Sequence, residues 1–188
     1  MTRIFLIRHG EPSAPWHAED DPGLSALGKA QAEAAAERLR ALGLARIVTS
    51  PMRRCRETAA PFMAAMGLDA AIEPRVTEVP TPAGTDRQVW LKANFPGAAG
   101  GEPKGWDFCE PAVGAWRADV MSALTAIEHD TAVFTHFVAI NAAVGAATNA
   151  AHAMVCKPAH ASITEIVCER GVLRLVAMGE EADGRKIA

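Results

Sequence analysis

The sequence predicts a three-layer α/β/α fold, with helices on both faces of a mostly parallel central sheet. Short apolar runs of strand length alternate along the chain with longer Ala- and Leu-rich segments of helical periodicity, and this alternation is typical of a parallel sheet. Hydrophobic residues make up 49% of the chain and charged residues 22%, a composition that excludes disorder. For a chain of 188 residues we expect a single domain over residues 1–188.

The chain begins with a predicted strand and a long predicted helix. Residues 2–7 are an apolar, β-branched run that we expect to form a buried strand. Ala, Leu, Gln and Glu dominate residues 25–42, where apolar residues recur at helical spacing. Ser25 is a suitable N-cap and Gly43 a suitable C-cap, so the pattern predicts a helix between them.

A second strand and a second helix follow. Residues 46–49 form a short apolar run that predicts a strand. The Ser50-Pro51 pair predicts an N-cap and the first residue of a helix, which we expect to continue to about residue 66. Residues 70–76 are expected to form a third strand.

Strands and helices alternate again in the last third of the chain. The predicted elements are helices over residues 113–127 and 138–148, a strand over residues 132–135, and a closing hairpin of residues 162–168 and 172–178 around Arg170 and Gly171. The region also contains a long uncharged stretch, residues 131–156. Because a membrane span there would bury His136 and Asn141, we expect a strand and a buried helix instead.

Residues 79–111 do not fit this alternation. The segment is rich in Pro and Gly, which predicts an irregular insertion. It also holds an unusual share of the large aromatic residues of the chain, namely Trp90, Phe95, Trp106 and Phe108. A substrate lid and a small packed Ω-loop both fit this composition.

Arginine and histidine side chains follow three of the predicted strands. Arg8 and His9 come at the end of the first strand. Arg54 lies in the first turns of the helix after the second strand, and His136 directly follows the strand at residues 132–135. Because the carboxyl ends of parallel strands meet at one edge of a sheet, we expect these side chains to lie together. Guanidinium groups bind phosphate oxygens bidentately, so the pattern predicts an oxyanion site.

Five short motifs surround these residues. They are Arg8-His9-Gly10-Glu11, Asp21-x-x-Leu24-Ser25-x-x-Gly28-x-x-Gln31-Ala32, Ser50-Pro51-x-x-Arg54-x-x-x-Thr58-Ala59, Thr135-His136 and Ala161-Ser162-Ile163-Thr164. In this order they resemble the motifs of the histidine phosphatase superfamily, which has the phosphoglycerate-mutase-like fold. The resemblance covers residues 2–78 and about 131–178.

The resemblance implies catalytic roles for five residues. His9 would be the nucleophile that becomes phosphorylated, while Arg8, Arg54 and His136 would bind the phosphoryl group. Glu78, which follows the third strand, would donate a proton to the leaving group. No metal ion or other cofactor is expected, because fixed cations meet the charge that develops during the transfer.

Two neighbouring residues add alternatives. Glu11 lies close to His9 in the sequence and could be the proton donor in place of Glu78. His17 is a candidate substrate-binding residue at the entrance of the site, and a solvent-exposed position is the alternative.

No metal site is predicted elsewhere in the chain. His152, Cys156 and His160 have ligand chemistry, but Pro158 interrupts their helical spacing and there is no fourth ligand. The four cysteines form no C-x-x-C pair and no signal-peptide pattern precedes them, so we expect a reduced, cytoplasmic protein. A net charge of −3 argues against a nucleic-acid partner. We expect a monomer or a homodimer.

The function implied by the resemblance is that of a phosphoric monoester hydrolase of the histidine acid phosphatase type. Two departures from the family pattern favour a phosphatase over a mutase. Residues 12–17 replace the usual mutase continuation after Glu11, and Phe137 stands where the family commonly has Gly. A phosphoglycerate-type mutase and a phosphate-binding or regulatory module are the alternatives. The expected partner is a small phosphorylated substrate, with a phosphoprotein as a further possibility.

Overall fold

The structure, a computed structural model, describes residues 1–15 and 19–182. Its strands are β1 (Thr2–Arg8), β2 (Arg46–Thr49), β3 (Ala70–Ile72), β4 (Thr131–Thr135), β5 (Ile163–Glu169) and β6 (Val172–Ala177). They form one sheet with the order β3-β2-β4-β1-β5-β6. The first four strands in this order are parallel to their neighbours, whereas β5 is antiparallel to β1 and β6 is antiparallel to β5. The mostly parallel sheet and the closing hairpin are therefore confirmed.

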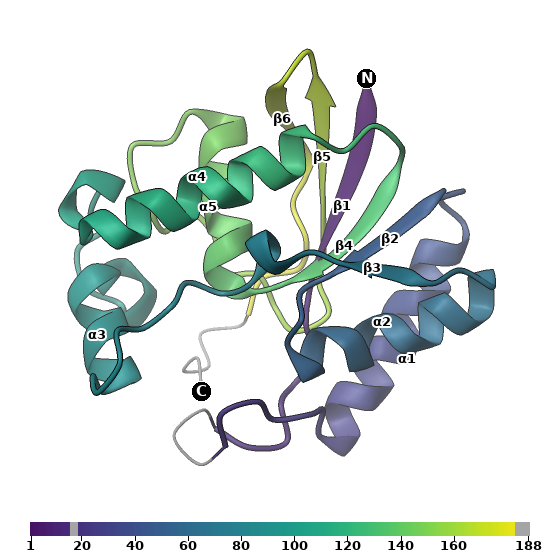
Figure 1. Ribbon diagram of the computed structural model, residues 1–188, viewed down its shortest axis with the longest axis horizontal. Coiled ribbons are helices and arrows are strands. Elements are labelled where there is room, and N and C mark those ends of the chain that lie inside the picture. Colours follow the sequence, from purple (N-terminus) through teal and green to yellow (C-terminus); the bar gives the residue numbers. More distant parts are fainter. Residues whose placement is uncertain (16–18, 183–188) are drawn as a thin grey trace.

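Helices cover both faces of the sheet, as predicted (Figure 1). The helices are α1 (Ala26–Arg40), α2 (Arg53–Met66), α3 (Arg87–Asn94), α4 (Pro111–Thr125) and α5 (Phe137–Thr148). Helices α1 and α2 lie together on one side of the sheet, and α4 and α5 lie on the other (Figure 1). The three-layer architecture is thus confirmed, with α3 outside these layers.

The central strand β1 is buried on both faces because its side chains alternate between two cores. Ile4 and Leu6 belong to the core that includes α4 and α5, and Phe5 and Ile7 belong to the core that includes α1 and α2. A continuous apolar run of this kind is typical of a parallel strand that is covered on both sides. The residues at the end of β1 are therefore held by a rigid element.

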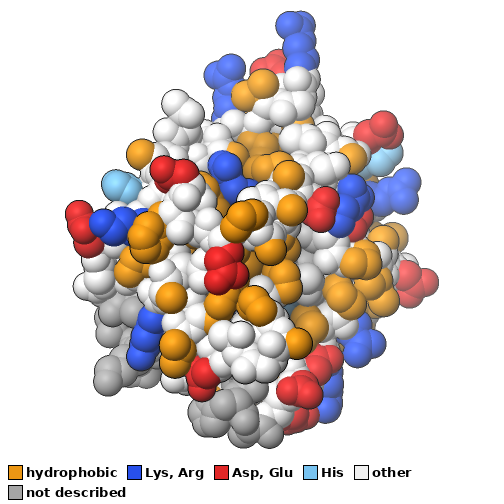
Figure 2. Space-filling model, turned by 60° about the vertical axis from the view of Figure 1, so that its left-hand side comes forward, with side chains coloured by type: hydrophobic (Ala, Val, Ile, Leu, Met, Phe, Trp, Pro, Cys, Tyr) orange, Lys and Arg blue, Asp and Glu red, His pale blue; other side chains and the backbone are white. Residues whose placement is uncertain are grey.

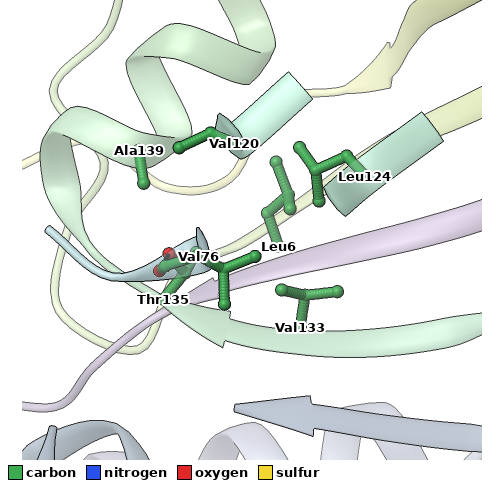
Figure 3. Close-up of a pocket in the computed structure, with 7 residues that line it drawn as sticks. All are labelled: Leu6, Val76, Val120, Leu124, Val133, Thr135 and Ala139. Carbon is green, nitrogen blue, oxygen red and sulfur yellow. Dashed lines mark hydrogen bonds between the residues drawn. The ribbon is translucent and has the colours of Figure 1, made fainter. Parts of the chain in front are cut away.

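The layer between the sheet and α4 is packed so closely that its internal gap has no room for a water molecule. Leu6 and Val133 lie on the strands, and Val120 and Leu124 project from α4 into the same region (Figure 3). The lining is almost entirely aliphatic. This layer is structural, and a polar ligand must bind elsewhere.

The caps of α1 agree only in part with the prediction. Ser25 is the N-cap, and its hydroxyl accepts a hydrogen bond from the Gly28 N–H, as predicted. The helix ends at Arg40 with Ala41 as its C-cap, so Gly43 is not the C-cap. Gly43 has a φ of +65° and supplies the left-handed turn that leads into β2.

Helix α2 begins later than predicted. Its N-cap is Met52, which makes no side-chain capping bond, and its first residue is Arg53. Ser50 is therefore not the N-cap of the helix. Its hydroxyl oxygen lies 2.8 Å from Nε2 of His136 and 3.1 Å from the hydroxyl of Thr77. The hydroxyl also accepts a hydrogen bond from the Met52 N–H at 3.3 Å, but its shortest contact is the long-range one with His136.

Strand β3 is shorter than predicted, because it ends at Ile72 and a 3₁₀ turn covers Pro74–Val76. Proline has no N–H to donate to a neighbouring strand, which explains why the ladder stops before Pro74. The Glu73 carboxylate caps the turn by accepting from the Arg75 N–H.

The segment 79–111 is more regular than predicted. It contains helix α3 and two 3₁₀ turns, Pro96–Ala99 and Trp106–Phe108. Trp90 and Phe95 are buried in the core that includes α4. The ring of Trp106 lies 6.0 Å from that of Phe95 and 6.4 Å from that of Trp116. Most of the aromatic side chains therefore extend the core, as in a packed loop, and the lid role stays a prediction.

The surface shows no dominant feature on the face drawn in Figure 2, where basic, acidic and apolar side chains are interspersed. The four cysteines all lie within the described residues and none forms a disulfide. Among the described helices, none is long and apolar enough to cross a membrane.

Candidate active site

The carboxyl ends of three neighbouring strands bring the predicted arginine and histidine residues together. His9 follows β1 and donates its backbone N–H to the Thr135 carbonyl oxygen of β4 at 3.0 Å. His136 follows β4, and Arg54 lies in the first turn of α2. Four side chains form what we call the Arg/His cluster, and each is at most 3% exposed: Arg8, His9, Arg54 and His136.

The imidazole of His9 has a defined tautomer. Its Nδ1 lies 2.8 Å from the Gly10 carbonyl oxygen, which can only accept, so Nδ1 carries the proton. The other ring nitrogen, Nε2, is buried and has no hydrogen-bond partner among residues 1–15 and 19–182. The ring packs edge-on against that of His136, with centroids 5.3 Å apart. Nε2 therefore presents a lone pair to the Arg/His cluster.

Close backbone packing holds the loop after His9 in place. A Cβ atom on Gly10 would lie only 2.6 Å from the Gly28 carbonyl oxygen, so this contact with α1 requires glycine. The Gly10 N–H donates to the Thr58 hydroxyl at 2.9 Å, and that hydroxyl donates to the Arg54 carbonyl oxygen at 2.6 Å. The motif residues Gly28 and Thr58 thus position the loop that carries His9.

Arg8 lies beneath this loop in a polar and aromatic setting. Its Nη1 donates to the Pro158 carbonyl oxygen at 2.9 Å, and its guanidinium lies over the Phe137 ring, 5.2 Å from the centroid. Its Nε has no hydrogen-bond partner within the part of the chain that the structure describes. Burial lowers the pKa of Arg8 to about 10, although the charge of Glu78 opposes the shift. Arg8 therefore stays cationic at neutral pH.

His136 is held from both of its ring nitrogens. Arg54 donates from Nη2 to Nδ1 at 3.2 Å, so the proton of a neutral ring lies on Nε2, which donates to the Ser50 hydroxyl at 2.8 Å. Arg54 also lies 3.8 Å from the Asp21 carboxylate. These contacts keep the Arg54 guanidinium beside His136.

Burial also determines the charge of the two histidines. It is the largest cause of the lowered pKa of His9, and the charges of His136, Arg8 and Arg54 lower this pKa further. The pKa of His136 is likewise held well below 6.5 by burial and by nearby arginines, Arg54 foremost. Both rings are therefore neutral at pH 7, and a neutral Nε2 lone pair on His9 is able to act as a nucleophile.

The two buried neutral histidines predict a loss of stability in mild acid. Below about pH 6.5 the unfolded chain binds protons on His9 and His136 that the folded chain does not bind, so the free energy of unfolding falls as the pH falls. Each histidine contributes up to about 1.4 kcal/mol per pH unit in this window. Urea denaturation between pH 7.5 and 5.5 measures the effect. The double variant His9→Asn/His136→Asn should show a flatter dependence, and an equally steep one would contradict this explanation.

The two candidate acids lie in different surroundings. Glu78 is 6% exposed, and its carboxylate accepts hydrogen bonds from the backbone N–H groups of Val79 and Val138 at 3.1 to 3.2 Å. These bonds place the Glu78 carboxylate at the N-terminus of α5, whose N-cap residue is His136. The Glu11 carboxylate instead accepts from the Ser25 hydroxyl at 2.8 Å, at the start of α1.

The sequence analysis named four other candidate residues, His17, His152, Cys156 and His160. His17 lies outside the described residues. No group of three or more potential metal ligands is arranged to hold an ion among the described residues, and this includes His152, Cys156 and His160. His160 instead lies beside His9, with ring centroids 5.7 Å apart.

Arg87 was not predicted from the sequence to lie near the site. This residue begins α3, and its Nη1 donates to the Val79 carbonyl oxygen at 3.1 Å and to the Thr81 hydroxyl at 2.5 Å. Burial lowers the pKa of Arg87, the charge of Glu78 raises it, and the charge of Arg54 lowers it further, so Arg87 interacts electrostatically with both residues. Only the folded position of α3 reveals this proximity, because no motif precedes Arg87 in the sequence.

Curated relatives are similar to part of the chain. A protein of Yersinia enterocolitica named "Probable phosphoglycerate mutase GpmB" is 32% identical over 126 residues, which is 58% of this chain and 58% of that protein. A protein of the same name from Enterobacter is 38% identical over 85 residues, 42% of this chain and 39% of the relative. The matched regions thus span less than two thirds of these relatives.

Solved structures are similar over nearly the whole chain. Mycobacterial glucosyl-3-phosphoglycerate phosphatase with inorganic phosphate has a TM-score of 0.72 at 23% identity, covering 96% of this chain and 98% of the other. The phosphoserine phosphatase of Entamoeba histolytica in complex with 3-phosphoglyceric acid has a TM-score of 0.72 at 19% identity, with the same coverages. At these identities the similarity is evidence for the fold, and the predicted phosphoglycerate-mutase-like fold is confirmed.

The family itself is identified from the sequence profile. Residues 4–181 match the profile of the histidine phosphatase superfamily, branch 1. This range includes every member of the Arg/His cluster and Glu78. The chain belongs to the histidine phosphatase superfamily.

Proposed function

We propose that the protein is a phosphohydrolase that cleaves phosphomonoesters through a phosphohistidine on His9. The observation that carries the proposal is the buried Nε2 of His9, whose lone pair has no hydrogen-bond partner among the described residues and lies within a cluster of two arginines and a second histidine. Such a cluster offers fixed positive charge and N–H donors to a phosphoryl group.

In the first step, the Nε2 lone pair of His9 attacks phosphorus and the ester P–O bond breaks. Arg8 and Arg54 bind the equatorial phosphoryl oxygens, and the Nε2–H of His136 exchanges its hydrogen bond with Ser50 for one with a phosphoryl oxygen. Glu78 gives a proton to the departing alcohol oxygen and becomes a carboxylate. The products of this step are the alcohol and phospho-His9.

In the second step, water attacks the phosphorus of phospho-His9 and the P–N bond breaks. The Glu78 carboxylate takes the proton from the attacking water, and the His9 imidazole leaves in its neutral form. Inorganic phosphate is released and both residues return to their starting states. Dividing hydrolysis in this way replaces one difficult displacement with two easier ones.

Glu78 is proposed as the proton donor in preference to Glu11. It is buried between the end of β3 and the start of α5, and its charge acts on Arg8. Glu11 is held by the Ser25 hydroxyl at the N-cap of α1. A proton donor must reach the leaving-group oxygen, and only Glu78 belongs to the surroundings of the cluster.

The choice between the two carboxylates predicts an effect that depends on the leaving group. Glu78→Gln should depress the hydrolysis of alkyl phosphates about a hundredfold or more, because an alkoxide needs a proton to depart. Hydrolysis of p-nitrophenyl phosphate should fall much less, since nitrophenolate leaves readily as an anion. Steady-state kcat/KM for both substrates measures this. Glu11→Gln is the matched control, and a leaving-group-dependent defect there instead would reverse the assignment.

A phosphoglycerate-type mutase is the second candidate, favoured by the name of the curated relatives. The two activities differ in the fate of the phosphoryl group. Incubating the protein with a panel of phosphate esters and measuring released inorganic phosphate against transferred phosphate tests the proposal. Release of inorganic phosphate in step with alcohol supports hydrolysis. Quantitative transfer to an acceptor would make the protein a mutase, and binding without turnover would make it a phosphate-binding module.

The finer classification is also part of the proposal. We class the activity as that of a phosphoric monoester hydrolase of the histidine acid phosphatase type, on the basis of the residue set alone. The proposed partner is a small phosphorylated molecule or a phosphoprotein, bound by a monomer or homodimer in the cytoplasm. The four free thiols agree with a reducing compartment.

A further inference from the structure

The connection between α5 and β5 is fastened directly to the residues at the end of β1. The Arg8 N–H donates to the Ser162 carbonyl oxygen at 3.2 Å, and the Ala161 N–H donates to the Arg8 carbonyl oxygen at 3.0 Å. The Arg8 side chain donates to the Pro158 carbonyl oxygen at 2.9 Å. Residues 158–162 therefore hold both the backbone and the side chain of Arg8.

This connection contains an unfavourable backbone conformation. Ala161 has a φ of +57°, in the left-handed region that residues with a Cβ atom rarely adopt. Such a conformation is unfavourable and persists where the surrounding contacts require it. Here it turns the chain so that the preceding residue, His160, lies against His9.

The ring of His160 lies 5.7 Å from that of His9, centroid to centroid, at an interplanar angle of 41°. Unlike the four members of the Arg/His cluster, His160 is only half-buried. It therefore lies on the outer side of His9. Within residues 1–15 and 19–182, its imidazole makes no hydrogen bond, and its one ring contact is with His9.

The electrostatic setting keeps this third imidazole uncharged. Burial and the neighbouring Arg8 lower the pKa of His160 to about 3. A neutral imidazole offers one N–H donor and one acceptor. When a phosphoryl group is bound to His9, its three equatorial oxygens are acceptors for an N–H donor beside that ring. A charge-assisted hydrogen bond to such an oxygen is stronger than one to a neutral acceptor.

We propose that His160 is a further phosphoryl-binding residue, whose imidazole N–H donates to an equatorial oxygen of the group held at His9. The proposal rests on the proposed function for the location of the phosphoryl group. It adds a ligand from the α5–β5 connection to those from β1, α2 and β4. The competing role is packing alone, in which the ring of His160 supports that of His9 without touching the substrate.

Two substitutions separate these roles, because each keeps one property of the imidazole. His160→Gln keeps an N–H donor and loses the aromatic ring, whereas His160→Phe keeps a ring and loses the donor. If His160 binds the phosphoryl group, His160→Phe should weaken inorganic phosphate binding about tenfold or more. His160→Gln should stay within about threefold of the unsubstituted protein. The reverse order would establish packing and overturn the proposal.

Isothermal titration with inorganic phosphate is the direct measurement, and thermal denaturation of each variant reports on folding. His152→Phe, an exposed histidine of the same connection, is the matched control and should bind phosphate normally. Should His160→Phe fail to fold, the histidine ring resonances of the unsubstituted protein provide a second test. Phosphate should shift the His160 signals, and an unchanged spectrum would overturn the proposal.

The outcome is distinguishable from that for the proposed function. If the unsubstituted protein binds phosphate but hydrolyses no ester, the proposed function fails while the His160 comparison can still be made. If the protein hydrolyses esters and His160→Phe binds phosphate as tightly as before, the function stands and the role of His160 is refuted.

Discussion

Replacing His9 with alanine is expected to lower kcat/KM by at least about 10⁴-fold for every ester that the protein hydrolyses. The reason is that Nε2 of His9 forms the covalent bond to phosphorus in the proposed mechanism, and His136, the other imidazole of the cluster, has no uncommitted ring nitrogen. His136 accepts from Arg54 through Nδ1 and donates to Ser50 through Nε2. Loss of His9 therefore removes the atom that forms this bond, and His136 cannot replace it.

The decisive measurement is the phosphoenzyme itself. Rapid quenching of the unsubstituted protein during turnover should trap a phosphoryl group that is labile to acid, and peptide mass spectrometry should assign it to His9. His129→Ala, a change at an exposed histidine, is the control and should form the adduct normally. An adduct that persists in His9→Ala, or normal turnover by that variant, would show that the nucleophile has been misassigned.

Replacing Arg54 with alanine is expected to lower kcat/KM about a hundredfold or more. Arg54 is 3% exposed at the start of α2, and its guanidinium would bind the phosphoryl oxygens with a planar fork that an ammonium lacks. Arg54→Lys should therefore recover only part of the activity. A second effect follows from the Arg54 hydrogen bond to Nδ1 of His136, because without Arg54 the pKa of His136 should rise toward its usual value.

The adjacent residue provides a matched control for this prediction. Arg53 has a side chain that is 54% exposed and pairs with Glu57 on the outer face of the same helix. Arg53→Ala should therefore leave kcat/KM within about twofold, because exposed ion pairs contribute little. Comparison of kcat/KM for the two alanine variants tests both assignments at once. A larger defect in Arg53→Ala than in Arg54→Ala would contradict the orientation of α2.

The parts of the site that could be predicted from sequence are those that follow directly from a strand. Arg8, His9 and His136 come immediately after β1 and β4, and the parallel pairing of those strands leaves little freedom in where the residues lie. Arg54 was predictable for a similar reason, since only the short connection of residues 50–52 and one helical residue separate it from β2. In each case the local sequence and the sheet topology together determine the position.

The parts that could not be predicted depend on contacts between distant segments. Ser50 is a residue type that often caps helices and lies where a cap is expected, but its hydroxyl makes a hydrogen bond with His136. His160 lies in a connection without periodicity and reaches His9 only because Ala161 adopts a left-handed conformation. Arg87 lies in a segment whose Pro and Gly content concealed helix α3. None of these contacts can be predicted from the sequence around the residues that make it.

The central place of β1 has a consequence for how the protein is made. Strand β1 is synthesised well before its two neighbours in the sheet, β4 and β5, which are formed by residues 131–135 and 163–169. Until those residues are synthesised, β1 is an apolar segment with both edges unpaired, the kind of segment that associates with other chains. Contacts between such distant segments also slow folding. The nascent chain thus carries β1 unpaired until those residues have been made, and the Arg/His cluster cannot assemble before His136 has been synthesised.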